Sequence, residues 1–146
     1  MRAVSPFFAD MNANLYALLR DHFAENGEQP CILHPGGKVI HYEDLDAMAA
    51  RIAHVLVDAG CQKGDCVASQ VDKGGQSRAL YLASLRAGLV YLPLNTGNQK
   101  SELAYFFGDA EPRVIACRPE SLETVSALRP EATVLSLSGE QGTLLD

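Results

Sequence analysis

The apolar residues near the start of the chain repeat first at helical spacing and then in short extended runs. Over residues 14–26 they recur three to four positions apart, which predicts a helix that ends in a left-handed cap at Asn26-Gly27. Two extended runs follow at residues 31–34 and 38–41, and the three residues between them read PGG, a composition typical of tight turns. This part of the chain is therefore predicted to be a helix followed by a β-hairpin.

From residue 42 onward, helical and strand patterns alternate. Helices are predicted at 42–59, 76–87, 103–111 and 119–129, and strands at 66–71, 89–92, 114–117 and 134–137. The runs at 89–92 and 114–117 are continuously apolar, which is typical of strands covered on both faces. Strands that alternate with helices form parallel βαβ units. The predicted fold class is α/β, an open and mostly parallel sheet flanked by helices, with a short N-terminal β-hairpin.

Length and charge narrow the possible classes of protein. The 146 residues match one domain, so we expect a single domain over 1–146. The formal net charge is −6, which argues against a nucleic-acid partner. No apolar run exceeds five residues, whereas a membrane-spanning helix needs about 20, and the segment between Arg2 and Asp10 lacks the apolar stretch of a secretory signal. We therefore expect a cytoplasmic protein with no membrane partner.

Residue types that could carry chemistry are scattered. The chain has four cysteines and four histidines, namely Cys31, Cys61, Cys66, Cys117, His22, His34, His41 and His54. Their spacing does not match a zinc site, so we interpret the cysteines as reduced and mostly buried thiols, and His34, His41 and His54 as packed or capping groups. The acidic residues Glu43, Asp44 and Asp46 are interpreted as the first turn of a helix, where negative charge is favourable.

Nucleotide and nucleophile motifs are absent from the sequence. Neither G-x-G-x-x-G nor G-x-x-x-x-G-K-[ST] occurs, and there is no G-x-S-x-G elbow for a hydrolase serine. Gly74-Gly75 lies between a predicted strand and a predicted helix, where backbone amides can bind an anion. A lone glycine pair is more often a simple turn, which is the interpretation we adopt.

Two longer segments resemble a known family. The sequence IHYEDL at residues 40–45 resembles L-[ST]-Y-x-E-L, and LRAGLVYLPLN at residues 85–95 resembles L-[KR]-A-G-x-x-Y-[LV]-P-[LI]-[DN]. These are the first two core motifs of the adenylate-forming superfamily, which contains acyl-CoA synthetases, luciferases and the adenylation domains of peptide synthetases. YLPLNT at 91–96 and DAEPRV at 109–114 are most similar to malonyl-CoA synthetases. The resemblance extends over essentially the whole chain.

The resemblance implies a reaction whose chemical groups lie elsewhere. Such enzymes join a carboxylate to ATP, release pyrophosphate, and transfer the acyl group to CoA, using Mg²⁺, a phosphate loop that ends in Lys-Gly, and a lysine on a C-terminal domain. We expect residues 1–146 to be the N-terminal scaffold segment of such an acid–thiol ligase, inactive alone, with no catalytic, cofactor-binding or metal-binding residue of its own. ATP, Mg²⁺ and CoA are implied only for the parent enzyme, and the expected partner is the remainder of that enzyme.

The chain departs from the family motif at helix starts. His41 stands where the motif has Ser or Thr, Asp44 stands where it has Glu, and Gln99 replaces a Ser or Thr three residues before Glu102. The Ser/Thr and acid pair forms a capping box that stabilises a helix by about 1 kcal/mol. We therefore expect these boxes to be weakened or remade.

Two other hypotheses remain open. The chain could be a non-catalytic α/β domain that binds a small ligand or a protein, with the ligand beyond the carboxyl ends of the parallel strands. The residues at those ends are Asp72, Lys73, Asn95, Thr96 and Arg118. Alternatively, an apolar face that the parent enzyme would cover is exposed, and the chain self-associates through it.

Overall fold

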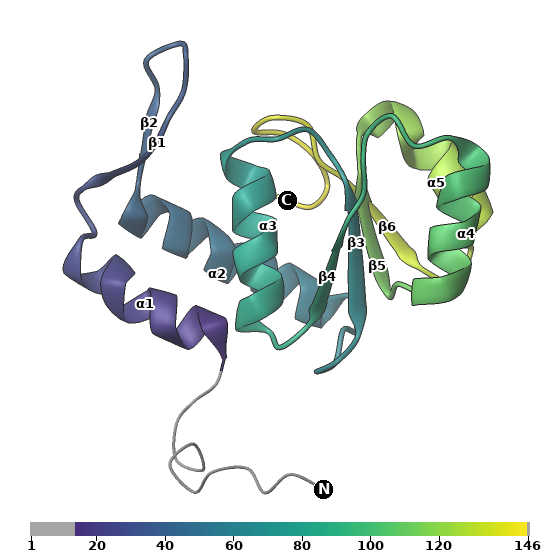
Figure 1. Ribbon diagram of the computed structural model, residues 1–146, viewed down its shortest axis with the longest axis horizontal. Helices are drawn as coiled ribbons and strands as arrows, with labels where there is room; N and C mark the ends of the chain where they lie inside the picture. The colour runs from purple at the N-terminus through teal and green to yellow at the C-terminus, as the bar shows by residue number, and fades with distance from the viewer. Residues whose placement is uncertain (1–13, 146) are drawn as a thin grey trace, which may run out of the picture.

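The computed structural model describes residues 14–145 and confirms the α/β fold class (Figure 1). The interpretation of the segment from Arg2 to Asp10 lies outside the described residues. The helices are α1 (Leu15–Glu25), α2 (Tyr42–Asp58), α3 (Gly75–Arg86), α4 (Lys100–Ala110) and α5 (Leu122–Leu128), and the strands are β1 (Pro30–Leu33), β2 (Val39–His41), β3 (Cys66–Gln70), β4 (Val90–Pro93), β5 (Val114–Cys117) and β6 (Thr133–Ser136). No helix within residues 14–145 is both long and apolar enough to cross a membrane.

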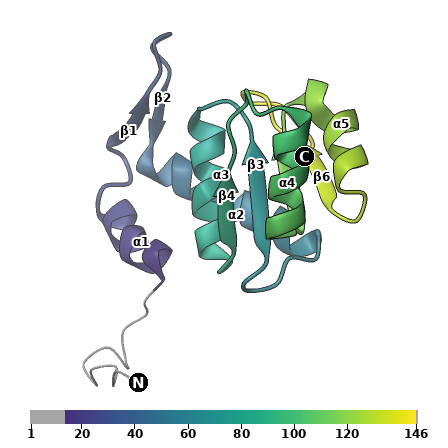
Figure 2. The same cartoon turned by 45° about the vertical axis from the view of Figure 1, so that its right-hand side comes forward.

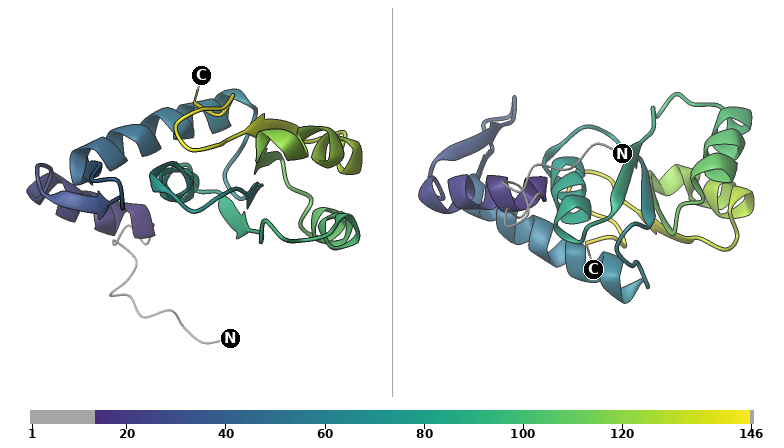
Figure 3. Two further views of the ribbon diagram at one scale, coloured as in Figure 1. Left: turned by 90° about the horizontal axis from the view of Figure 1, so that it is seen from above. Right: turned by 60° about the horizontal axis from the view of Figure 1, so that its bottom comes forward.

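The main sheet has four parallel strands in the order β4-β3-β5-β6. Seen from above, α2 and α3 cover one face of it, while α4 and α5 cover the other (Figure 3). Successive side chains of a strand point to opposite faces, so Val67 joins the core with α2 and α3 and Ala68 joins the core with α4 and α5. The predicted βαβ order thus produces two hydrophobic cores, one on each face of the sheet.

Strands β4 and β5 were both predicted to be covered on both faces, but only β5 is covered in this way. All four residues of β5 are buried, as the apolar run predicts. Strand β4 lies at the edge of the sheet, and Val90 is 55% exposed, so the prediction for β4 was wrong. A run of apolar residues reports hydrophobicity but carries no information on the position of a strand within a sheet.

The β-hairpin is confirmed as a separate two-stranded antiparallel sheet. Together with α1, it lies to one side of the main sheet and its helices (Figure 2). The turn between β1 and β2 uses Gly37 at φ +83°, a backbone conformation that glycine adopts without strain. The hairpin leads directly into α2, because β2 ends at His41 and α2 begins at Tyr42.

Most helix boundaries follow the sequence, but three differ from the prediction. Helix α4 begins at Lys100, three residues before the predicted start at 103. No left-handed cap forms after α1: Asn26 has φ −118°, and its side-chain Nδ2 donates to the carbonyl of His22 at 2.9 Å instead. The segment predicted as a helix over 119–129 begins as a 3₁₀ turn, Pro119–Ser121, before α5. Asparagine can end a helix through its side chain as well as through its backbone, and the sequence alone did not distinguish the two.

A partly buried polar cluster around the buried Tyr16 joins the three helices α1, α2 and α3. The Tyr16 hydroxyl donates to Asp46, Arg86 donates to the Tyr16 hydroxyl, and Arg86 Nη1 lies 3.6 Å from Asp46 Oδ1. The Arg86 guanidinium also lies over the Tyr16 ring, 5.1 Å from its centroid. Asp46 was interpreted as a first-turn charge with Glu43 and Asp44. The structure corrects this, because Asp46 instead anchors α1 through Tyr16.

The start of α3 packs so closely on the hairpin that a side chain at position 75 would displace its neighbour. A Cβ built on the buried Gly75 would lie 2.3 Å from Cδ1 of Ile40, which is itself buried. We predict that Gly75→Ala lowers the free energy of unfolding by about 1–3 kcal/mol, because the buried Ile40 must move. Urea denaturation of the variant and the wild type measures this change.

Gly108→Ala is the matched control for that substitution. Gly108 is exposed within α4, and a Cβ there would meet no atom within 4 Å. We expect this change to raise the free energy of unfolding by about 0.5–1 kcal/mol, because alanine favours the helix. Equal effects of the two substitutions would contradict the packing argument.

Candidate functional site

The carboxyl ends of β3 and β4 border an open cleft of about 570 Å³. Its lining includes four of the five residues that the sequence placed at the strand ends, Asp72, Lys73, Asn95 and Thr96. Parallel strands bring their carboxyl ends to one edge of the sheet, which is why residues more than 20 positions apart meet here. The fifth residue, Arg118, follows β5 and reaches the same place, since its Nη2 lies 3.4 Å from the Thr96 carbonyl oxygen.

The segment after β4 forms a closed turn that makes one wall of this cleft. The backbone N–H of Leu94 donates to the Ser69 carbonyl at 2.8 Å, which fixes the end of β4 to β3. Beyond it, the N–H of Asn98 donates to the Asn95 carbonyl at 3.0 Å, and the Asn95 side-chain Oδ1 accepts from the N–H of Gly97 at 2.9 Å. The strand-end cleft therefore has a wall whose shape depends on Asn95.

One residue that holds this turn was missed by the sequence analysis. Gln70, the last residue of β3, is buried, and its Nε2 donates to the Asn95 carbonyl oxygen at 3.1 Å. Its signal in the sequence is an amide within the predicted strand at 66–71. Buried polar side chains are expected to be hydrogen-bonded, so this position could have been identified as a residue with a specific partner.

Charges around the strand-end cleft are balanced. Lys73 and Arg118 supply positive charge, and Asp72 adjoins Lys73 in the lining. The Arg118 Nε lies 3.3 Å from a carboxylate oxygen of Glu120, which partly neutralises the guanidinium. A polyphosphate needs several uncompensated positive groups or a metal ion for tight binding. The cleft by itself thus has the shape of a ligand site without the charge excess that phosphoryl transfer requires.

Gly74-Gly75 forms the turn that the sequence analysis expected. The N–H of Gly74 donates to the Ser77 hydroxyl at 2.8 Å, and that hydroxyl lies 3.0 Å from the Gly74 carbonyl oxygen, to which it donates. The side chain of Arg78 also donates to this carbonyl. The glycine pair therefore serves the local turn and the packing on Ile40.

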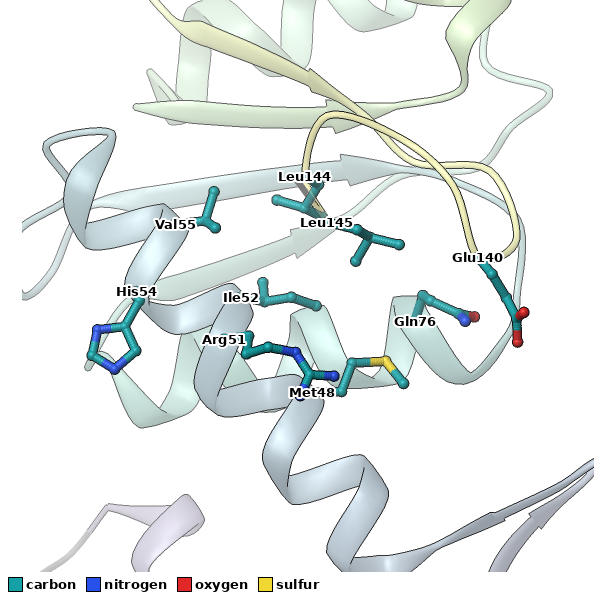
Figure 4. A pocket seen from close by; sticks show the side chains of 9 residues that line it. All are labelled: Met48, Arg51, Ile52, His54, Val55, Gln76, Glu140, Leu144 and Leu145. Carbon is teal, nitrogen blue, oxygen red and sulfur yellow. The ribbon is translucent and has the colours of Figure 1, made fainter.

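A second hollow, of about 530 Å³, lies between α2 and the C-terminal segment (Figure 4). Leu144 and Leu145 of that segment lie near Ile52 and Val55 of α2. Arg51, His54, Gln76 and Glu140 also contribute to its lining. The lining is mainly apolar and its polar groups do not converge on one point, so this hollow is a groove and has no arrangement suited to acid–base chemistry.

The cysteines carry no activated thiol. All four are free; Cys61 and Cys117 are buried, while Cys31 and Cys66 are partly buried. Burial raises the pKa of all four thiols, and for Cys117 burial, with a contribution from the charge of Glu120, raises the pKa to about 11. Within residues 14–145, no group of three or more His, Cys, Asp or Glu side chains could hold a metal ion.

Comparison with known proteins identifies the family. A family model described as AMP-binding enzyme matches residues 19–144. The chain belongs to the AMP-binding enzyme family. This confirms the resemblance to adenylate-forming enzymes that the motifs at 40–45 and 85–95 predicted.

Solved structures of this AMP-binding family have the same fold. ATP-bound MatB from Rhodopseudomonas palustris is 43% identical, with a TM-score of 0.87 over 92% of this chain and 27% of the MatB chain. The N-terminal domain of FACL13 from Mycobacterium tuberculosis is 23% identical, with a TM-score of 0.76 over 83% of this chain and 33% of that domain. The second likeness concerns the fold alone.

Curated relatives are far longer than this AMP-binding chain. Chalcone synthase cfoA from Aspergillus candidus is 34% identical over 129 residues, which are 88% of this chain and 5% of the relative. The chain thus spans about a quarter of the length of MatB and a much smaller share of cfoA.

The raised pKa of Cys117 has a measurable consequence. The thiol of an unfolded chain has a pKa of roughly 8.5, whereas the pKa in the folded protein is about 11. The folded state therefore holds this proton to higher pH than the unfolded state does. We predict that the stabilising contribution is complete below pH about 8.5 and is lost as the pH rises toward about 11. Urea denaturation across this range measures the loss.

Two comparisons check the assignment to Cys117. In Cys117→Ala, the loss of stability between these pH values is expected to be smaller than in the wild type, since one titrating thiol has been removed. At pH 8, Cys117 of the folded protein is also expected to resist alkylation until urea is added. Rapid alkylation of Cys117 in the folded protein would contradict a buried thiol with a raised pKa.

Proposed function

We propose that this chain is the N-terminal scaffold part of an ATP-dependent acid–thiol ligase, specifically a malonyl-CoA synthetase. The reaction of the whole enzyme joins malonate to CoA through an acyl-adenylate, with release of pyrophosphate and AMP. The observation that carries the proposal is the 43% identity to MatB, a malonyl-CoA synthetase, over 92% of this chain. The motifs at residues 91–96 and 109–114 support the same acyl class.

The family motifs have structural tasks in this chain, which supports a scaffold role. Residues 40–45 carry the chain from the hairpin into α2, and residues 85–95 carry it from α3 through β4 to the strand-end cleft. Gly88 adopts φ +71° where α3 ends, as its place in the motif predicts. Tyr91 packs against Tyr81 of α3 with ring centroids 5.3 Å apart.

The motif departures preserve the helix starts by other means. The Asp44 carboxylate accepts from the backbone N–H of His41 at 3.2 Å and contacts the His41 ring Nδ1 at 3.2 Å, and these bonds lower the pKa of Asp44. At α4, the N–H of Gln99 donates to Glu102 at 2.6 Å. The acid half of each capping box is thus kept, although neither box begins with Ser or Thr.

The proposed scaffold role predicts that residues 1–146 alone are inactive. The resemblance assigns the phosphate loop and the catalytic lysine to other parts of the enzyme, and groups of this kind supply most of the rate enhancement in phosphoryl chemistry. We expect no malonyl-CoA above the no-enzyme control when the chain is incubated with malonate, ATP, Mg²⁺ and CoA. Detection of the thioester by mass spectrometry would contradict this part of the proposal.

A second candidate function is favoured by the strand-end cleft. A non-catalytic α/β domain could bind a nucleotide there, with Lys73 and Arg118 toward its phosphates. Calorimetric titration with ATP, AMP and CoA distinguishes the two functions. Saturable micromolar binding that weakens in Lys73→Ala would support the binding domain, and the absence of heat would support the scaffold.

We also propose that the remainder of the parent enzyme covers the exposed apolar surface around β4. Val90 of the edge strand and Tyr81 of α3 are large, apolar and exposed. Without that cover, we expect the isolated chain to associate with itself through this surface, because an open apolar edge strand pairs readily. Sedimentation velocity should show concentration-dependent association that decreases in Val90→Lys. A monomer at every concentration would count against self-association.

A further inference from the structure

Gln70 is a polar residue in a position where an apolar one would serve the fold. It ends β3, the strand between β4 and β5, and it is only 3% exposed. Its partner in register on β5 is the buried Cys117. The side chain of Ala68, two residues earlier and on the same face, belongs to the core with α4 and α5. Gln70 therefore lies at the end of a hydrophobic core and beside the strand-end cleft.

The two polar atoms of its amide have different surroundings. Nε2 donates to the Asn95 carbonyl at 3.1 Å, whereas Oε1 is buried and has no hydrogen-bond partner among the described residues. An unsatisfied buried acceptor lowers the stability of the folded state. An apolar side chain of similar shape would remove it and would leave the Asn95 carbonyl with its bond from the Asn98 N–H, so it would cost the core little stability. Stability of the core therefore does not explain a glutamine here.

The bond to Asn95 offers the explanation. The Asn95 carbonyl accepts from Gln70 and also from the N–H of Asn98, and the Asn98 side chain accepts from the N–H of Asn95 at 2.8 Å. The turn at residues 95–98 is thus closed on itself and attached to the sheet through Gln70. On its other side, the guanidinium of Arg118 reaches the Thr96 carbonyl at 3.4 Å.

We infer that Gln70 is a positioning residue of the strand-end cleft: its amide fixes the turn at residues 95–98, and with it the cleft wall formed by Asn95 and Thr96. Gln70 acts through Asn95 and does not line the cleft itself. For the binding of a ligand, this inference rests on the second candidate function, in which the cleft holds a nucleotide. The order of the turn is a property of the chain with or without a ligand.

The test compares local order with global stability in Gln70→Met. Methionine is close to glutamine in length and removes both polar atoms. We expect the amides of Gly97 and Asn98 to exchange with deuterium about three- to tenfold faster, since the carbonyl that anchors the turn loses one bond. The thermal midpoint is expected to stay equal or to rise. Unchanged exchange at these two amides, or a lower midpoint with uniform loss of protection, would overturn the inference.

A matched control separates this effect from the loss of any buried hydrogen bond. Ser84 is fully buried in α3, and its hydroxyl donates to the Leu80 carbonyl at 2.9 Å. Ser84→Ala removes one buried side-chain bond within α3, and neither Ser84 nor Leu80 is a residue of the turn. We expect exchange at Gly97 and Asn98 to be unchanged in this variant, and acceleration there equal to that in Gln70→Met would contradict a specific role of Gln70.

Gln70→Glu tests the donor directly. An ionised carboxylate cannot donate to the Asn95 carbonyl, whereas the protonated acid can, and burial of the new side chain favours protonation. The neighbouring groups are the guanidinium of Arg118 and the thiol of Cys117, which, with its pKa of about 11, stays neutral between pH 5 and pH 8. We expect protection of Gly97 and Asn98, relative to the wild type at each pH, to recover as the pH falls from 8 to 5. Protection that is independent of pH in this variant would contradict the donor role.

Titration with ATP and with CoA then separates this inference from the binding function. If the wild type binds either one, we expect Gln70→Met to weaken binding by about three- to tenfold, in step with the loss of turn order. Equal affinity in the two proteins would overturn the claim that the turn positions the ligand. If the wild type binds neither nucleotide, the binding function fails, and the exchange experiment alone decides whether Gln70 fixes the turn.

Discussion

The structure depends on the burial of β3 between two neighbouring strands and two layers of helices. Its backbone is hydrogen-bonded to β4 on one side and β5 on the other, and its side chains alternate between the two hydrophobic cores. Parallel strands need crossover connections, so each neighbour of β3 arrives with a helix that covers one face. The position of β3 therefore determines where α3 and α4 pack and which strand ends lie side by side.

The strand-end cleft follows from the same arrangement. Because the strands are parallel and in register, Asp72 after β3, Asn95 after β4 and Arg118 after β5 reach the same edge of the sheet. The family motif that ends at Asn95 fixes this geometry through the end of α3 at Gly88 and the packing of Tyr91. In this chain, the motif residues determine the shape of the strand-end cleft. The charges around that cleft are balanced.

Local chemistry could be predicted from the sequence wherever a residue acts through its own backbone or a near neighbour. Gly88, which lies in the family motif at 85–95, follows α3 in the left-handed conformation, and Gly37 has a positive φ in the predicted PGG turn. Predictions were wrong where a distant partner decides. Asp46 bonds to Tyr16 of another helix, whereas the error at Asn26 was local, since its side chain bonds to His22 four residues earlier. A pattern along one segment contains no information on a partner 30 residues away.

The sequence by itself determined the element order, the α/β class, the family and the candidates for the strand-end cleft, because periodicity, glycine conformation and motif spacing are local properties. Only the tertiary structure decided which strand lies at the edge. The runs at β4 and β5 are equally apolar, yet strand order leaves Val90 exposed and buries Val114. The tertiary structure likewise decided what Gly75 and Gln70 contact. The close approach of Gly75 to Ile40 and the bond from Gln70 to Asn95 exist only once distant segments have packed together.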